Sequence, residues 1–367
     1  MNNNKAIFSP VKLGKNYLQH RVVMAPLTRF RATLDAVPTD SMVELYKQRA
    51  TEGGLMITEA TFITRLAGGF TRAPGIYNQE QINAWKKVAA AVHEKKATIF
   101  LQLWHVGRAG ANRLNPNNEQ VVSASDIAIR GNHILMDGAY DKPHALTVDE
   151  IKTIVQDYRQ AALNAMEAGF DGVEIHSGNG YLLDQFINTN SNKRTDLYGG
   201  SIANRTRFAL EVLEAVVDAV GPECTSIRLS PSTQFQDMGD ETPVETWSYL
   251  TSEIQKRFPT LAYLHFIEPR ANMFDNSVNL VDSLHHYRNL FKGPFISASG
   301  YSTAPEHAID IAEKTGDLVA FGRAFVANPD LVERLRNGWE LNKYDRNTFY
   351  THDDVGYLDY PYYYYNK

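Results

Sequence analysis

The sequence predicts an α/β protein of the TIM (β/α)8 barrel type, with an N-terminal hairpin and an insertion after the third strand. Three observations lead to this prediction: short β-rich apolar runs recur along the chain, amphipathic helical segments separate them, and no dinucleotide fingerprint follows the first run. The composition, 43% hydrophobic and 22% charged, is typical of a folded globular chain. Because such barrels can exceed about 250 residues as one unit, we expect residues 1–367 to form a single domain.

The apolar runs are interpreted as eight parallel strands. They lie at 22–24, 55–58, 98–103, 172–176, 226–229, 263–266, 295–297 and 318–321. Each strand–helix–strand crossover lays the next strand parallel to the last, and closure of the sheet removes both of its edges. The main alternative is an open doubly wound sheet, which would usually carry G-x-G-x-x-G directly after the first strand. Here Met24 is followed by APLTR instead.

Helical periodicity fills the intervals between these strands. One apolar stripe lies at positions 151, 154, 155, 158, 162 and 165, and a second lies at 210, 213, 216, 217 and 220. A threonine followed three residues later by a glutamate predicts a capping box at a helix start. This pattern occurs at Thr147 and Glu150, at Thr242 and Glu245, and at Thr303 and Glu306.

Two regions lie outside the strand–helix repeat. Residues 1–20 predict a short hairpin, with strands at 11–13 and 17–19 on either side of Gly14, which could plug the bottom of the barrel. Residues 104–147 are too many for a simple connection, and we expect them to form an insertion over the barrel mouth.

Charge and cysteine content exclude several classes of function. The net charge is −5, and no block of like charges occurs, so nucleic acid is not an expected partner. Cys224 is the only cysteine, which excludes an internal disulfide, a four-thiolate zinc site and a cysteine-ligated iron–sulfur cluster. No metal site is expected. No segment is long and apolar enough for a signal peptide or membrane span, so we expect a cytoplasmic protein without a membrane partner.

Polar residues follow the fourth predicted strand, where barrel enzymes place their active sites. Alternation turns Glu174 and His176 to the same side of the strand. His176 and Asn179 could donate hydrogen bonds to one oxygen, and Tyr181 offers a phenol that is protonated at neutral pH. The alternative is a structural histidine in a glycine turn.

The loops after the seventh and eighth strands predict a phosphate site. Ser299, Gly300 and Tyr301 follow one strand, and Gly322 and Arg323 follow the other. Glycine lets backbone amides approach an anion, and arginine adds a two-pronged charge. A helix start with a surface ion pair is the alternative for the Gly-Arg pair.

Three further strand ends carry Thr28, Gln102 and Arg228. A hydroxyl, an amide and a guanidinium around one mouth can border a flat heteroaromatic ring with donors and acceptors at its edge. Taken singly, the three could be a turn hydroxyl, a solvated strand end and a salt bridge.

The sequence resembles the Old Yellow Enzyme family of flavin-dependent alkene reductases over nearly its whole length. The segments that carry the resemblance are MAPLTR at 24–29, QLW at 102–104, GVEIHSGNGYLLDQF at 172–186, RTD at 194–196, YGGS at 198–201, and the pairs Asn204-Arg205, Gly322-Arg323 and Asn328-Pro329. The resemblance implies a barrel that binds flavin mononucleotide (FMN) and uses NAD(P)H as its reductant.

The resemblance also implies a role for each matching position. The FMN contacts would be Ala25, Pro26, Leu27, Thr28, Ala60, Gln102, His176, Arg228, Ser299, Gly300, Tyr301, Gly322 and Arg323. His176 and Asn179 would hold the substrate's carbonyl or nitro oxygen, and Tyr181 would donate the proton. The substrate side would be shaped by Phe70, Trp104 and Tyr350. The implied reaction is a ping-pong reduction of an activated C=C bond, with quinones and nitroesters as further candidate substrates.

Departures from the family pattern limit this implication. Gly178 stands where many relatives have alanine, which predicts a looser loop around Asn179, and Phe70 stands where relatives often have tyrosine. Thr28 occupies the place of a cysteine found in one subgroup, so we assign the branch without that thiol.

Three other functions remain open: a flavin barrel that oxidises amines or dihydropyrimidines, a flavoprotein that only stores or reports redox state, and a flavin-free lyase or aldolase. The physiological substrate, the choice of NADPH or NADH, and the state as monomer or homodimer also stay open.

Overall fold

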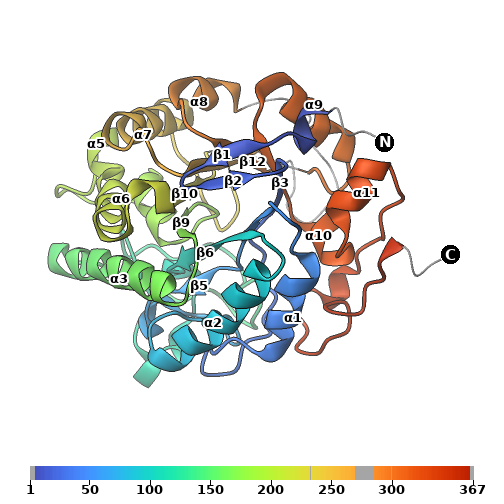
Figure 1. The fold of residues 1–367 in the computed structure, drawn as a ribbon. Helices are drawn as coiled ribbons and strands as arrows, with labels where there is room; N and C mark the ends of the chain where they lie inside the picture. The colour runs from blue at the N-terminus through green and yellow to red at the C-terminus, as the bar shows by residue number, and fades with distance from the viewer. Residues whose placement is uncertain (1–4, 232, 269–283, 299, 364–367) are drawn as a thin grey trace.

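The computed structural model describes residues 5–231, 233–268, 284–298 and 300–363, and shows a closed parallel barrel of eight strands (Figure 1). The barrel strands are β3 (Val22–Met24), β4 (Leu55–Ile57), β6 (Thr98–Trp104), β9 (Gly172–Ser177), β10 (Thr225–Leu229), β11 (Tyr263–Ile267), β12 (Phe295–Ala298) and β13 (Leu318–Phe321). Each pairs in parallel with its neighbour, and the β4–β6 and β13–β3 pairings close the ring. The barrel prediction and its eight strands are confirmed, and the open sheet is excluded.

Alternation along the strands separates two apolar cores. In β6, Leu101 and Leu103 belong to the large core between barrel and helices, whereas Phe100 belongs to a smaller cluster inside the barrel. Leu13 and Leu18 of the hairpin join that inner cluster. The hairpin strands β1 (Val11–Leu13) and β2 (Asn16–Leu18) therefore plug the barrel, as the sequence predicts.

Helices surround the barrel on its outer face (Figure 1). They are α1 (Asp40–Arg49), α2 (Gln79–His93), α3 (Val148–Glu167), α4 (Leu182–Ile187), α5 (Ile202–Arg205), α6 (Arg207–Val220), α7 (Pro243–Arg257), α8 (His285–Leu290), α9 (Pro305–Thr315), α10 (Arg323–Ala327) and α11 (Leu331–Asn337). The apolar stripe predicted at 151–165 is buried along α3, and Leu210, Leu213 and Val216 are buried along α6.

One of the three predicted capping boxes forms. Thr147 and Glu150 cap α3 reciprocally. The other two predictions are wrong, because other partners take the hydroxyl groups. Thr242 Oγ1 bonds to Asp240 and Thr246, and Thr303 Oγ1 donates to the carbonyl of Gly300.

The insertion after the third barrel strand consists mainly of short turns, with 3₁₀ turns at Gly107–Ala109, Asn112–Leu114 and Pro116–Asn118. Its strand β7 (Val122–Ser123) pairs with β8 (His144–Ala145), and a further short strand, β5 (Thr61–Phe62), pairs with β6. Ile134 and Leu135 of the insertion line the cavity at the barrel mouth, so the predicted cover over the mouth is confirmed.

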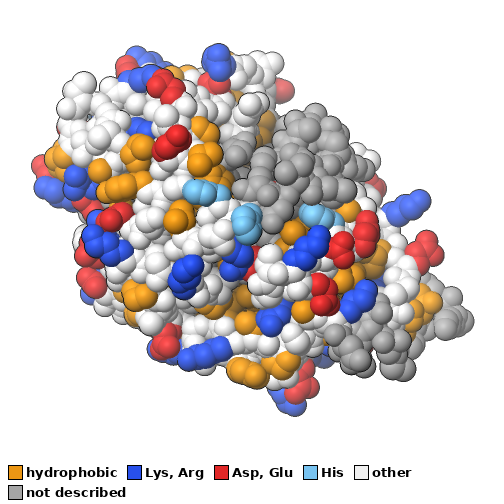
Figure 2. Space-filling view, turned by 90° about the horizontal axis from the view of Figure 1, so that it is seen from above, with side chains coloured by type: hydrophobic (Ala, Val, Ile, Leu, Met, Phe, Trp, Pro, Cys, Tyr) orange, Lys and Arg blue, Asp and Glu red, His pale blue; other side chains and the backbone are white. Residues whose placement is uncertain are grey.

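The surface carries mixed charge. Figure 2 shows Lys and Arg side chains interspersed with Asp and Glu side chains on one face. Among the described residues, no helix is long and apolar enough to cross a membrane. No group of three or more His, Cys, Asp or Glu side chains within the same residues is placed to hold a metal ion.

Candidate active site

A cavity of about 430 Å³ opens at the carboxyl ends of the barrel strands. Residues at or after the ends of β3, β4, β6, β9, β10, β12 and β13 line it, which gives it the size and position of a cofactor site. The residues singled out from the sequence that line this cavity are Ala25, Pro26, Leu27, Thr28, Ala60, Phe70, Gln102, Trp104, His176, Asn179, Tyr181, Arg228, Gly300, Gly322, Arg323 and Tyr350.

One predicted phosphate contact, Tyr301, is placed differently from the prediction. Ser299 lies outside the described residues. The side chain of Tyr301 is buried in the barrel wall, where its hydroxyl shares a hydrogen bond of 2.8 Å with Ser297 Oγ, and it does not line the cavity. Only the backbone of Tyr301 is therefore available to a ligand. Cys224 is buried and also lies outside the cavity lining.

Strand register builds the floor of the cavity, which we define as Gln102, Glu174, His176, Arg228 and His265. The pairings join Gln102 to Glu174, His176 to Arg228, and Arg228 to His265 across neighbouring strands. Gln102 Nε2 donates to Glu174 Oε1 at 2.7 Å, and Glu174 Oε2 lies 2.8 Å from His265 Nδ1. Burial alone would raise the pKa of Glu174, but His265, Arg228 and Gln102 outweigh it and hold the pKa below its usual value.

Three polar atoms of the floor are buried without a hydrogen-bond partner among the described residues: Arg228 Nε, His176 Nδ1 and His265 Nε2. The first two belong to side chains that line the cavity. Burial lowers the pKa of His176 well below its usual value, and Arg228 and His265 lower it further, so the ring is neutral. A neutral imidazole carries one N–H that can donate to a ligand oxygen. Buried polar groups without partners are costly, so the floor is suited to a polar ligand in the cavity.

The loop after β9 brings Asn179 and Tyr181 to the same cavity. Asn179 adopts a left-handed backbone with φ of 56°. The Tyr181 ring meets Trp104 edge-on, with ring centroids 4.9 Å apart, and meets His176 in the same way at 5.0 Å. Burial raises the pKa of Tyr181, and the neighbouring Tyr350 raises it further, so the phenol is protonated at neutral pH and can donate a proton.

Gly178 packs closely in this loop, in contrast to the looser loop that the sequence predicts. A β-carbon at position 178 would lie 2.8 Å from Ser230 Oγ, which is the atom that accepts a hydrogen bond from Asn179 N. The glycine therefore allows a close approach between the β9 loop and the loop after β10.

The other end of the cavity is formed by the loops after β12 and β13, with Gly300, Ser302, Thr303, Gly322 and Arg323 in its lining. Hydroxyl groups, backbone amides and a guanidinium in one place are suited to a phosphate. Because β12 and β13 lie across the ring from β6 and β9, a ligand that contacts both ends must span the mouth.

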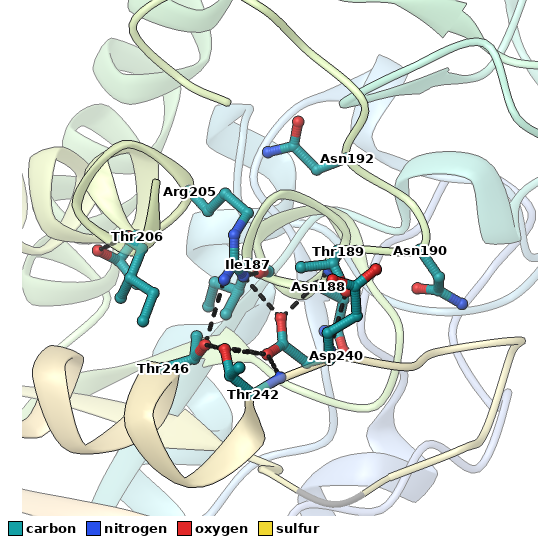
Figure 3. A network of polar contacts seen from close by, with 12 residues as sticks. Ile187, Asn188, Thr189, Asn190, Asn192, Arg205, Thr206, Asp240, Thr242 and Thr246 are labelled. Carbon is teal, nitrogen blue, oxygen red and sulfur yellow. Dashed lines mark hydrogen bonds and ion pairs between the residues drawn. The ribbon is translucent and has the colours of Figure 1, made fainter. Parts of the chain in front are cut away.

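The rim of the cavity, which we define as Asn179, Tyr181, Phe235 and Tyr350 with Ile134 and Leu135, is attached by side-chain bonds to distant backbone. Sequence reasoning missed these attachments. Buried Arg108 donates from Nη2 to the carbonyls of Gln236 and Asp237, next to Phe235. Asp240, at the end of the same loop, forms a buried salt bridge of 2.6 Å with Arg205, as Figure 3 shows. The Thr242 hydroxyl donates to the other oxygen of this carboxylate and does not cap α7.

Three buried arginines, Arg29, Arg31 and Arg49, hold the C-terminal segment that carries Tyr350, and we call them the arginine clamp. Arg29 Nη2 donates to the carbonyl of Gly356 at 2.7 Å, and Arg49 Nη2 donates to that of Tyr357 at 3.2 Å.

Within the clamp, Arg31 donates to the carbonyls of Thr348, Phe349 and Asp353 at 2.9–3.0 Å. The available sequence signal was the pair of arginines at alternate positions directly after the first strand.

Comparisons with known proteins agree with this geometry. The NADH:flavin oxidoreductase / NADH oxidase family matches residues 6–342. The 12-oxophytodienoate reductase 1 of Oryza sativa subsp. japonica is 47% identical over 357 residues, covering 97% of this chain and 93% of its own. The flavin oxidoreductase hxnT of Emericella nidulans is 45% identical over 382 residues, covering 97% of each chain. The solved structure of morphinone reductase in complex with tetrahydroNAD has a TM-score of 0.90 at 43% identity, covering 98% of each chain.

Proposed function

Because the chain belongs to the NADH:flavin oxidoreductase / NADH oxidase family, we propose that it reduces C=C bonds conjugated to a carbonyl or nitro group. Family membership makes it an NAD(P)H-dependent flavin oxidoreductase with FMN as its cofactor, and confirms the resemblance to the Old Yellow Enzyme family. The observation that supports the proposal most strongly is one cavity shared by the unpartnered Arg228 Nε and His176 Nδ1 and by the Asn179 and Tyr181 side chains.

The residues of the cavity fit FMN. Gln102 and Arg228 would hold the polar edge of the ring system, and the positive charge of Arg228 would favour negative charge on the reduced ring. Thr28 would hydrogen-bond to the same ring, and Gly300, Gly322 and Arg323 would hold the phosphate. When bound, FMN supplies a carrier that takes hydride from NAD(P)H and passes it to the β-carbon of the alkene.

The protein's own residues polarise the substrate. His176 and Asn179 donate hydrogen bonds to the substrate oxygen, where negative charge develops during hydride transfer. The loss of one such donor typically costs about 2.7–4 kcal/mol in the transition state. Tyr181 delivers a proton to the α-carbon from the face opposite the hydride donor, so the net addition is trans. NAD(P)H and the alkene use the same open face in turn.

The names of the relatives support a substrate with a carbonyl oxygen. The rice enzyme is named for 12-oxophytodienoate and the solved structure for morphinone, both of which are named as oxo compounds. Trp104, Phe70 and Tyr350 form the aromatic side of the cavity. The Trp104 and Phe70 rings stack 5.6 Å apart at 12°, which leaves a flat apolar wall for an alkene.

The test is an absorption spectrum of the purified protein followed by an anaerobic titration. We expect a yellow protein whose flavin band is bleached by NADPH or NADH and restored by 2-cyclohexenone, with cyclohexanone as product. A protein that takes up no FMN would exclude every flavin function. If NADPH or NADH bleaches the flavin band but the enone does not restore it, the result would favour a flavoprotein that only stores or reports redox state.

A further inference from the structure

The loop after β9 carries two consecutive left-handed residues at the cavity. Asn179 has φ of 56° and Gly180 has φ of 76°. A non-glycine residue is uncommon in this conformation, and asparagine is among the few that adopt it readily. The hydrogen bonds of these two backbone amides therefore show what fixes the position of Asn179.

Both amides donate to buried side chains. Gly180 N donates to Asp184 Oδ2 at 2.8 Å. Asn179 N donates to Ser230 Oγ at 2.7 Å, and Ser230 lowers the pKa of the Asp184 carboxyl group. Because the Ser230 oxygen accepts from Asn179, its own proton is available to the carboxylate. Asp184 thus holds the Gly180 amide directly, and Ser230 holds the Asn179 amide.

The Asp184 side chain accepts hydrogen bonds from the surrounding donors, although burial raises the pKa of its carboxyl group to about 7. Asn188 Nδ2 donates to Asp184 Oδ1 at 2.9 Å, so the Asp184 side chain accepts from a backbone amide and from a side-chain amide. An asparagine at position 184 would turn its own NH₂ group toward one of these donors.

Asp184 acts through the loop and does not contact the ligand. It is completely buried at the start of α4 and does not line the cavity. In contrast, the Asn179 side chain lines the cavity, and the loop leads directly into Tyr181.

We propose that Asp184 is a positioning residue that sets where Asn179 and Tyr181 meet the substrate; this inference rests on the proposed alkene reduction. Asp184 holds the turn in its left-handed conformation. The turn in turn sets the position of Asn179, which donates to the substrate oxygen. The cofactor residues on the strand ends do not depend on this turn.

The test compares Asp184→Asn with wild type as the FMN-loaded enzyme. We expect oxidation of the reduced enzyme by 2-cyclohexenone to slow by at least about tenfold, because small misplacements of positioning groups have effects of this size. FMN content should stay unchanged. A crystal structure of the variant should show Asn179 displaced from its left-handed backbone.

The double variant Asp184→Asn/Asn188→Asp provides the rescue. The new side-chain NH₂ group at position 184 would then face a carboxylate at position 188, while the side-chain oxygen at position 184 still accepts from Gly180 N; only the bond from Asn188 Nδ2 to the Asp184 carbonyl is lost. We expect the enone rate to return to within about threefold of wild type, since a merely structural loss would not be repaired by exchanging the two groups. If Asp184→Asn alone does not fold, Ser230→Ala removes only the link to Asn179 and should lower the same rate less strongly.

Asp171→Asn is the matched control. Asp171 also accepts a backbone amide, from Ile99 at 2.8 Å, but precedes β9 at the opposite end of the barrel. We expect 2-cyclohexenone to oxidise the reduced Asp171→Asn enzyme at the wild-type rate.

The proposal is overturned if Asp184→Asn is oxidised by the enone as fast as wild type, or if the exchange variant folds yet is no faster than Asp184→Asn. If wild type itself does not reduce the enone, the alkene function fails, and the Asn179 backbone in the crystal structure still decides the positioning role.

Discussion

The floor and the rim of the cavity are held in different ways. The floor depends on strand register, and its side chains bond to one another between barrel strands, as Gln102, Glu174 and His265 do. The rim depends on single side chains that reach backbone far away in sequence, as Arg31 reaches Asp353. The floor is therefore a property of the barrel, whereas each part of the rim can be loosened by one substitution.

The largest expected effect is on the rim and comes from Arg31→Met. The change removes the five hydrogen bonds of a buried guanidinium, to the carbonyls of Arg29, Thr348, Phe349 and Asp353 and to Thr351 Oγ1, which should lower the free energy of unfolding by about 3 kcal/mol. Because the freed segment carries Tyr350, the KM for 2-cyclohexenone should also rise. Thermal denaturation and steady-state kinetics measure the two effects.

Arg65→Met is the control for this prediction, since Arg65 donates to the carbonyl of Leu114 at an exposed site. It should change stability by less than about 1 kcal/mol. Equal losses in both variants would show that the arginine clamp has no special role in the rim.

The next effect is on the phosphate end of the cavity and comes from Arg323→Ala. Loss of a charge-assisted contact should weaken FMN binding by about 1.5–3 kcal/mol, or roughly ten- to a hundredfold. At saturating FMN the enone rate should equal that of wild type, because the rim is unchanged. Fluorescence titration with FMN measures the affinity. Two results would contradict the assignment of Arg323 to the FMN phosphate: wild-type affinity for FMN in the variant, or slow oxidation by 2-cyclohexenone even at saturating FMN.

The free energy of unfolding should depend on pH with opposite signs for one group in the floor and one group beside the arginine clamp. Burial lowers the pKa of His265 in the floor, so its contribution to stability is lost as pH falls below about 6.5. Burial raises the pKa of Glu59, which contacts the Arg29 amide beside the clamp, to about 7, so its contribution is lost as pH rises from 4.5 toward 7.

Two variants test these opposite signs by denaturant unfolding at pH 7 and pH 5.5. The stability lost on acidification should be smaller in His265→Asn and larger in Glu59→Gln, each by about 1 kcal/mol relative to wild type. Shifts in the same direction for both variants would refute the contrast.

The smallest effect is expected from Leu135→Ala in the insertion. Leu135 is 41% exposed and only partly contacts the cavity, so less than about 1 kcal/mol of binding should be lost. We expect a change of a few-fold in KM for a bulky enone and none for 2-cyclohexenone. If both KM values change equally, the insertion does not shape specificity.

The sequence predicted the floor because its signals are local. Alternation in β9 places Glu174 and His176 on one side, and strand ends meet at the barrel mouth whatever the loops do. It did not reveal the partner of Glu174, because His265 lies on β11, two strands away in the sheet order.

The rim was less predictable because its bonds are non-local and aperiodic. The turn residues of the β9 loop were identified, but Asp184 sits on α4 and looks like an ordinary helical residue. The bond from Arg31 to Asp353 leaves no spacing that could be recognised. The local pattern also gave a wrong prediction at Thr242. The capping box does not form there, because the backbone amide and the hydroxyl of Thr242 donate to Asp240.

The central claim is that the floor holds the cofactor, with His176 also donating to the substrate oxygen, and that the rim serves the substrate alone. It is tested most directly by anaerobic stopped-flow measurement of both half-reactions in Tyr181→Phe. We predict that NADPH reduces the flavin within about twofold of the wild-type rate, while oxidation by 2-cyclohexenone slows by roughly a hundredfold. Unchanged rates in both half-reactions, or equal losses in both, would contradict it.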